Sequence, residues 1–174
     1  MKNVSVKGKC WGIDSFEDSL IVGYQPPRPS VEMLSEDGDV LKNTASNSSG
    51  DQQFQCPDNI HIDTTTGTAR ILVPDRGRKT VYMLNIDLQL LKAFQVPSGG
   101  SPRGMAAVEG GQVLVVDVGT RTLRLLDLIT GRWQTLLGKE EGLERPWCLV
   151  YNQAINGLYV GCIGNDIKEY TVSE

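Results

Sequence analysis

The sequence predicts an all-β fold, a β-propeller of four blades with four short strands in each. Three observations lead to this prediction: a repeat that recurs along the chain, short apolar runs inside each repeat, and an extra run at the start that matches a missing run at the end. A repeat of about 45 residues that holds four short strands is typical of propeller blades. No segment of 11 or more residues has the apolar spacing of an amphipathic helix.

Each repeat has an apolar anchor at its fourth residue, and successive anchors are 47, 45 and 44 residues apart. The anchors are Ile13, Ile60, Met105 and Leu149. We therefore expect one propeller domain, residues 1–174, with blades at approximately 10–55, 56–100, 101–144 and 145–174.

The runs inside each repeat have the composition of strands, because they are rich in Val, Ile, Leu and aromatic residues and are bounded by Gly, Pro, Asn or Asp. The second run is almost wholly apolar, as expected for a strand buried between blades, and occurs at 20–22, 71–73, 113–116 and 158–160. The third run alternates more, and occurs at 31–34, 81–84, 123–126 and 167–170. A fourth run follows in three repeats, at 40–41, 90–94 and 133–137.

The two ends of the chain are compatible with either a closed or an open ring. The last repeat has no fourth run, and the chain begins with an extra strand-like run at 2–8. In one arrangement this N-terminal strand completes the last blade and closes a ring of four blades. In the other, the chain is a partial arc of a larger ring, whose bare sheet edges favour self-association.

The composition excludes several classes of protein. The net charge of −4 argues against a globally basic nucleic-acid-binding protein. No apolar run approaches the roughly 18–20 residues that cross a bilayer, and none follows the basic N-terminus. We expect a cytoplasmic protein without membrane contact. Its four cysteines (Cys10, Cys56, Cys148 and Cys162) lack the spacing of a zinc site, and we expect them to be reduced.

The third repeat carries the most specific motif in the chain. It reads Pro-Arg-Gly-Met from Pro102, has a strand that ends at Asp117, and closes with Asp-Leu-Ile-Thr-Gly from Asp127. This pattern resembles the NHL repeat. The second repeat matches through Pro57 and Asp75, whereas the first and fourth lack the aspartate.

The resemblance implies a recognition module of the kind found at the C-terminus of tripartite-motif ubiquitin ligases, where NHL propellers bind protein or RNA. Similar six-bladed rings include metal-dependent lactonases. The chain has no RING-like array of Cys and His and no B-box. Ligase activity is therefore not carried over.

Charged residues separate onto two faces if the loops are sorted by the propeller topology. Loops between the second and third strands, and loops between blades, share one face, which we call the basic face. Its basic residues are Lys7, Lys9, Arg28, Arg76, Arg78, Lys79, Arg103, Arg121, Lys139 and Arg145. Its acidic residues are Asp51, Asp75, Asp117, Glu140, Glu141, Glu144 and Asp166. The opposite face carries nine acidic residues and only Arg70 and Arg132.

We therefore predict a non-enzymatic binding role for the basic face, without cofactor, metal or catalytic residues. Trp11 and Trp147 occupy the same repeat position as Arg103, just inside this face. Tryptophan and arginine are enriched at interface hot spots, and arginine pairs well with carboxylates and phosphates. The predicted binding residues are Trp11, Arg28, Arg76, Arg78, Lys79, Arg103, Arg121, Arg145 and Trp147.

Two alternatives remain at this stage. An RNA ligand is favoured by the basic run 76–79, but acidic residues share the same face, so a protein or peptide partner is preferred. A calcium-dependent hydrolase is the second alternative, with candidate ligands at Asp14, Asp58, Asn59, Asp63 and Asn152 that do not recur in phase. The only histidine, His61, is expected to be a strand residue that faces a neighbouring blade or solvent.

Overall fold

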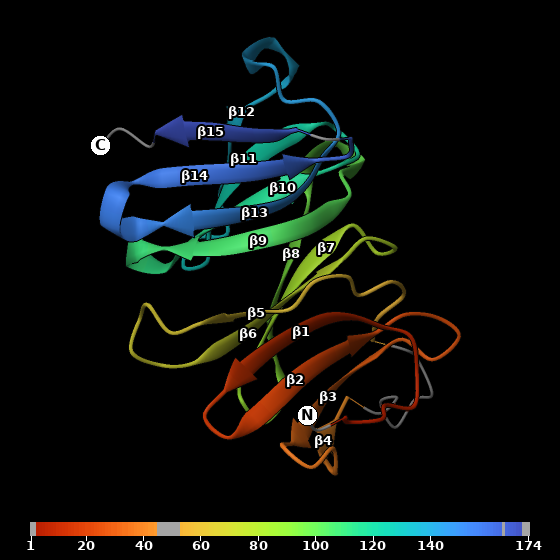
Figure 1. Ribbon diagram of the computed structural model, residues 1–174. Helices are drawn as coiled ribbons and strands as arrows, with labels where there is room; N and C mark the ends of the chain where they lie inside the picture. Colours follow the sequence, from red (N-terminus) through yellow and green to blue (C-terminus); the bar gives the residue numbers. More distant parts are fainter. Residues whose placement is uncertain (1–2, 45–52, 165, 172–174) are drawn as a thin grey trace.

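The computed structural model describes residues 3–44, 53–164 and 166–171, and it consists of four antiparallel sheets (Figure 1). Blade 1 contains β1 (Cys10–Phe16), β2 (Ser19–Tyr24), β3 (Ser30–Ser35) and β4 (Val40–Asn43). Blade 2 contains β5 (His61–Asp63), β6 (Arg70–Asp75), β7 (Thr80–Leu84) and β8 (Leu90–Gln95). Blade 3 contains β9 (Pro102–Val108), β10 (Gln112–Asp117), β11 (Thr122–Asp127) and β12 (Trp133–Leu137). Blade 4 contains β13 (Pro146–Asn152), β14 (Gly157–Cys162) and β15 (Ile167–Thr171).

Within each sheet the strands pair in chain order, which is the meander of a propeller blade. The predicted all-β architecture of four blades is confirmed. Helical structure among the described residues is confined to 3₁₀ turns of three residues. None of these helices is long and apolar enough to span a membrane.

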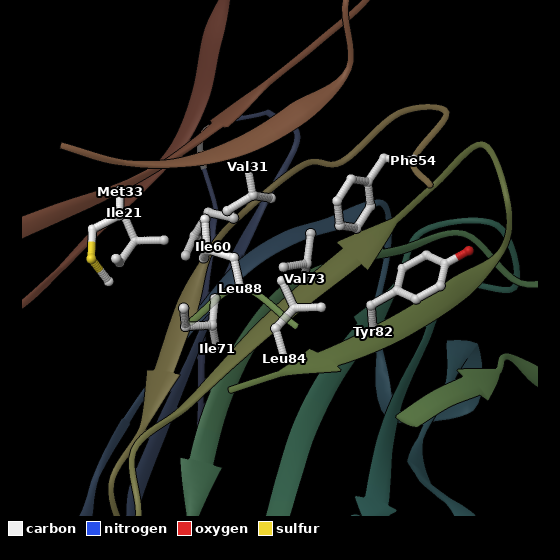
Figure 2. Close-up of a cluster of buried hydrophobic side chains, with 10 residues drawn as sticks. All are labelled: Ile21, Val31, Met33, Phe54, Ile60, Ile71, Val73, Tyr82, Leu84 and Leu88. Atoms are coloured by element: carbon white, nitrogen blue, oxygen red, sulfur yellow. The ribbon is translucent and has the colours of Figure 1, made fainter. Parts of the chain in front are cut away.

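The core consists of apolar layers between consecutive blades. Figure 2 shows the first layer, in which Ile21 and Met33 of blade 1 face Ile71 and Leu84 of blade 2. Because side chains alternate across a strand, Val22 points to the other side of blade 1 and belongs to a separate cluster. The second layer joins blades 2 and 3, and the third joins blades 3 and 4.

Central strands that face two layers are apolar between their polar end residues. Leu72 of β6 packs toward blade 3 while Ile71 packs toward blade 1, and Val113 and Leu114 of β10 divide in the same way. All four side chains are at most 2% exposed. This two-sided burial explains why the second run of each repeat lacks the alternation of a half-exposed strand.

The expected N-terminal strand at 2–8 does not form within the described residues, and the ring is not closed by it. Residues 3–9 lie against the outer side of blade 1, where the Lys9 carbonyl accepts a hydrogen bond from the Gln25 amide at 3.0 Å. Gly8 packs on the ring of Tyr24. The apolar face formed by Val22, Tyr24 and Leu34 provides the reason, since the segment covers part of it.

Consequently, the described residues form three inter-blade layers and no buried cluster between blade 4 and blade 1. β15 has one strand partner, β14, and lies far from blade 1 along the row of blades (Figure 1).

The aspartate of the repeat motif joins two loops through hydrogen bonds. Asp75 is fully buried, and its carboxylate accepts hydrogen bonds from the amides of Gln55, Cys56 and Arg78. The first two amides precede the blade and the third lies in the β6–β7 turn, so one side chain joins the blade's entry to its outer hairpin. Asp117 repeats this arrangement in blade 3, with Ser101 at the entry.

Candidate functional site

The second residue of each repeat lies at the start of the first strand of its blade or, in blade 2, just before it. These four residues are Trp11, Asp58, Arg103 and Trp147. Arg103 is central, because its guanidinium carbon lies 3.4 Å from the ring centroid of Trp147 and 5.8 Å from that of Trp11. The two tryptophans, which share the repeat position of Arg103, therefore lie beside its guanidinium group.

A buried carboxylate balances this arginine. Nη1 of Arg103 lies 3.3 Å from Oδ2 of Asp58, and Nε of Arg76 lies 3.7 Å from the same oxygen. Arg76 also stacks over Trp11 at 6.0 Å. We call Trp11, Asp58, Arg76, Arg103 and Trp147 the axial cluster.

The axial cluster is held by charge and stacking more than by hydrogen bonds. Asp58 Oδ2, Arg76 Nε and two nitrogens of Arg103 are buried and form no hydrogen bond in the structure. Burial raises the pKa of the Asp58 carboxyl, and the two nearby guanidinium groups act in the opposite direction. Burial likewise lowers the pKa of Arg103, while Asp58 raises it. The cluster thus contains buried donors and a buried acceptor that no hydrogen bond satisfies.

The two tryptophans give the cluster an accessible rim. Trp11 is 52% exposed and Trp147 is 38% exposed, whereas Arg103 between them is only 4% exposed. An aromatic rim around a buried arginine has the composition of an interface hot spot.

Three of the remaining predicted residues share an unusual backbone conformation. Lys79, Arg121 and Arg145 are exposed, and their φ angles are 55°, 57° and 47°. This left-handed region costs roughly 1–2 kcal/mol for a residue other than glycine. Basic side chains therefore occupy positions that glycine would fill at lower conformational cost.

Arg28 and Arg78 are placed differently. Arg28 lines a pocket on the outer side of blade 1. Arg78 lies in the β6–β7 turn, where its amide donates to Asp75. Among the described residues, no ion pair, hydrogen bond or cation–π contact joins Arg28, Lys79 or Arg121 to the axial cluster.

Sequence reasoning missed the role of Asp58. It appeared among the calcium candidates, although it is in phase with Trp11, Arg103 and Trp147. That phase was the signal, because residues at one repeat position meet at the axis of a propeller.

The structure does not bring the proposed calcium ligands together. Asp14 accepts from the amides of Ser15 and Ile62, and Asp58 pairs with the arginines. Asn59, Asp63 and Asn152 accept hydrogen bonds from their own loops or strand neighbours. Across the described ranges, no three His, Cys, Asp or Glu side chains are grouped to hold a metal ion.

His61 lies in an inter-blade contact. Its Nε2 accepts a hydrogen bond from the Ala107 amide of blade 3 at 3.0 Å, and its Nδ1 lies 4.0 Å from Oδ2 of Asp14 in blade 1. Burial lowers the pKa of His61, while Asp14 and Asp63 act in the opposite direction. A neutral imidazole at this position links three blades.

We expect stability to fall as the pH drops below about 6.5, the usual pKa of histidine. In that range the unfolded chain binds a proton that folded His61 does not, because Nε2 is occupied as an acceptor. The slope is at most about 1.4 kcal/mol per pH unit, and it ends below the folded pKa. Urea unfolding between pH 7 and pH 5 measures it. His61 is the only histidine, so His61→Gln should flatten this slope, and an unchanged slope would contradict the assignment.

Comparisons with known proteins identify the fold but no family. No family model matches the chain, and neither does any curated protein. Among solved structures, the computationally designed Ika4 protein is similar with a TM-score of 0.68 and 12% identity, over 97% of this chain and 94% of that one. Virginiamycin B lyase from Staphylococcus aureus is similar with a TM-score of 0.66 and 10% identity, over 94% of this chain.

A protein of unknown function from Bacteroides caccae is also similar, with a TM-score of 0.65 and 18% identity over 91% of this chain. The chain spans 56% of the lyase and 58% of the Bacteroides protein. At these identities the likeness concerns the propeller fold alone. Membership of the NHL-repeat family stays a prediction.

Proposed function

We propose that this propeller is a non-enzymatic binding module that recognises an acidic segment of a protein or peptide through its basic face. This role resembles that of the substrate-recognition region of tripartite-motif ubiquitin ligases. The axial cluster is the observation that carries the proposal. The buried guanidinium of Arg103 and the half-buried guanidinium of Arg76 have nitrogens without hydrogen bonds, and two half-exposed tryptophans border them.

The charge distribution supports an acidic partner. Asp75 and Asp117 belong to the basic face by position, but both are fully buried and bind loop amides. They therefore add little negative charge at the surface. The exposed cations Lys79, Arg121 and Arg145 sit in costly backbone conformations, which is expected where the side chain serves binding.

A random dodecapeptide library displayed on phage tests the proposal. We expect selection on this chain to enrich peptides rich in Asp and Glu. The triple variant Lys79→Glu, Arg121→Glu and Arg145→Glu should bind the enriched peptides at least about tenfold more weakly, since charge complementarity is reversed at three places. Fluorescence anisotropy measures the affinities. All three residues are exposed, so the fold should persist.

The matched control is Arg70→Glu with Arg132→Glu on the opposite face, and it should bind as the parent does. Enrichment without acidic bias, or unchanged binding by the triple variant, would refute the proposal. RNA is the second candidate, because the basic run 76–79 lies on the same face. Tighter binding of a uridine dodecamer than of any selected peptide, with a steep salt dependence, would favour RNA instead.

A further inference from the structure

A second concave site lies on the outer side of blade 1, apart from the axial cluster. It has a volume of about 450 Å³ and opens where residues 7–9 cross the ends of β2 and β3. The lining side chains that matter here are Lys7, Lys9, Tyr24, Pro27, Arg28 and Glu32.

Positive charge dominates this pocket. Lys7, Lys9 and Arg28 border it, and Glu32 is the one carboxylate in its lining. No ion pair among the described residues joins any of the three cations to a carboxylate. Unpaired cations around a concavity attract and concentrate anions.

Tyr24 provides a buried polar group at the pocket. The residue is 4% exposed, and its buried hydroxyl makes no well-aligned hydrogen bond, although the Glu32 carboxylate lies close enough to interact with it. Burial, and then the nearby Glu32 carboxylate, raise the pKa of Tyr24, so the hydroxyl keeps its proton at neutral pH. A ligand oxygen would give this hydroxyl a well-aligned acceptor in competition with Glu32.

The rest of the lining combines apolar rings with two neutral polar residues, Gln25 and Ser30. The ring of Tyr24 and the ring of Pro27 form surface that a charged group alone would not use, and the lysine stems extend it. Sites for small molecules have volumes of roughly 300–1,000 Å³ and combine an apolar lining with a few polar groups. An inorganic anion would fill only part of this space.

We propose that this pocket binds a small organic carboxylate. The carboxylate lies among Lys7, Lys9 and Arg28 and accepts a hydrogen bond from the Tyr24 hydroxyl. The apolar body of the ligand lies against Tyr24 and Pro27. This site is separate from the axial cluster and does not depend on the function proposed above.

The probe is 2-naphthoate, compared with its neutral amide, 2-naphthamide. Both are titrated into the full chain while ¹H–¹⁵N spectra follow the amides of Gly8, Gln25 and Ser30, which line the pocket. We expect the signals of these backbone amides to shift when 2-naphthoate is added. We expect 2-naphthamide to bind at least about tenfold more weakly. One charged hydrogen bond of about 1.5–3 kcal/mol accounts for a difference of this size.

Two variants and one control complete the test. Lys9→Gln with Arg28→Gln should weaken binding of 2-naphthoate at least about tenfold, and Tyr24→Phe, which keeps the ring, about threefold to tenfold. Arg132→Gln, exposed on the opposite face, should change nothing. Equal binding of acid and amide, shifts centred outside the pocket, or full competition by equimolar inorganic phosphate would overturn the proposal. Spectra of each variant without ligand establish that it is folded.

Discussion

Replacing Asp117 by alanine should destabilise the propeller by about 3–5 kcal/mol, the cost of removing one partner from a buried ion pair. The carboxylate is fully buried and lies 3.1 Å from Nε of Arg124, which is 8% exposed. It also accepts hydrogen bonds from Ser101 and Thr120. The variant leaves these donors and a buried guanidinium unsatisfied. Since small domains are stable by about 5–15 kcal/mol, this loss is a large fraction of the total.

Urea unfolding followed by tryptophan fluorescence measures the effect. Asp127→Asn is the control, because Asp127 is a more accessible aspartate of the same blade that also accepts turn amides. It should shift the midpoint much less. The double variant Asp117→Asn with Arg124→Met should recover part of the loss, because it leaves no unpaired charge. If the single variant Asp117→Ala is as stable as the parent, then the buried interactions of this aspartate do not stabilise the blade.

The division into four blades was predictable because the blade is the repeating unit of the chain. Inter-blade packing requires apolar central strands, and the neighbours Ile71 and Leu72, which face opposite layers, show the two-sided burial that removes polar residues from these runs. Aspartates at the strand ends mark the same register. Such local requirements leave a pattern in the sequence.

The course of the N-terminal segment was not predictable in this way. A run such as Val4–Val6 suits a strand at the edge of blade 4 and also suits a cover for the apolar face of blade 1. The choice depends on surfaces brought together by tertiary packing, here Tyr24 and Val22. No property of the segment alone distinguishes the two.

The candidate site was predictable in part for a similar reason. Trp11, Arg103 and Trp147 share a repeat position, and the structure brings their side chains together. The negative charge of Asp58 in the sequence does not indicate whether this side chain binds a metal ion or a guanidinium group. Arg28, which topology groups with the basic face, lines the pocket of blade 1 together with Lys7 and Lys9.

Replacing Arg103 by methionine should cost about 3 kcal/mol at pH 7, because Asp58 then keeps only Arg76 at 3.7 Å while it stays buried. The loss should shrink toward pH 4. Burial without Arg103 raises the folded pKa of Asp58 further above its unfolded value. The folded protein therefore loses stability as the pH rises between these two pKa values.

Arg103→Lys separates charge from stacking in this cluster. It keeps a cation near Asp58 but loses the planar contact with Trp147, so it should cost less, about 1–2 kcal/mol. Arg103→Met combined with Asp58→Asn should recover most of the stability and abolish the pH dependence, since no buried carboxylate remains. If this double variant is as unstable as Arg103→Met, then packing on the tryptophans, and not the ion pair, holds the axial cluster together. Unfolding of all three variants at pH 4 and pH 7 decides between the two.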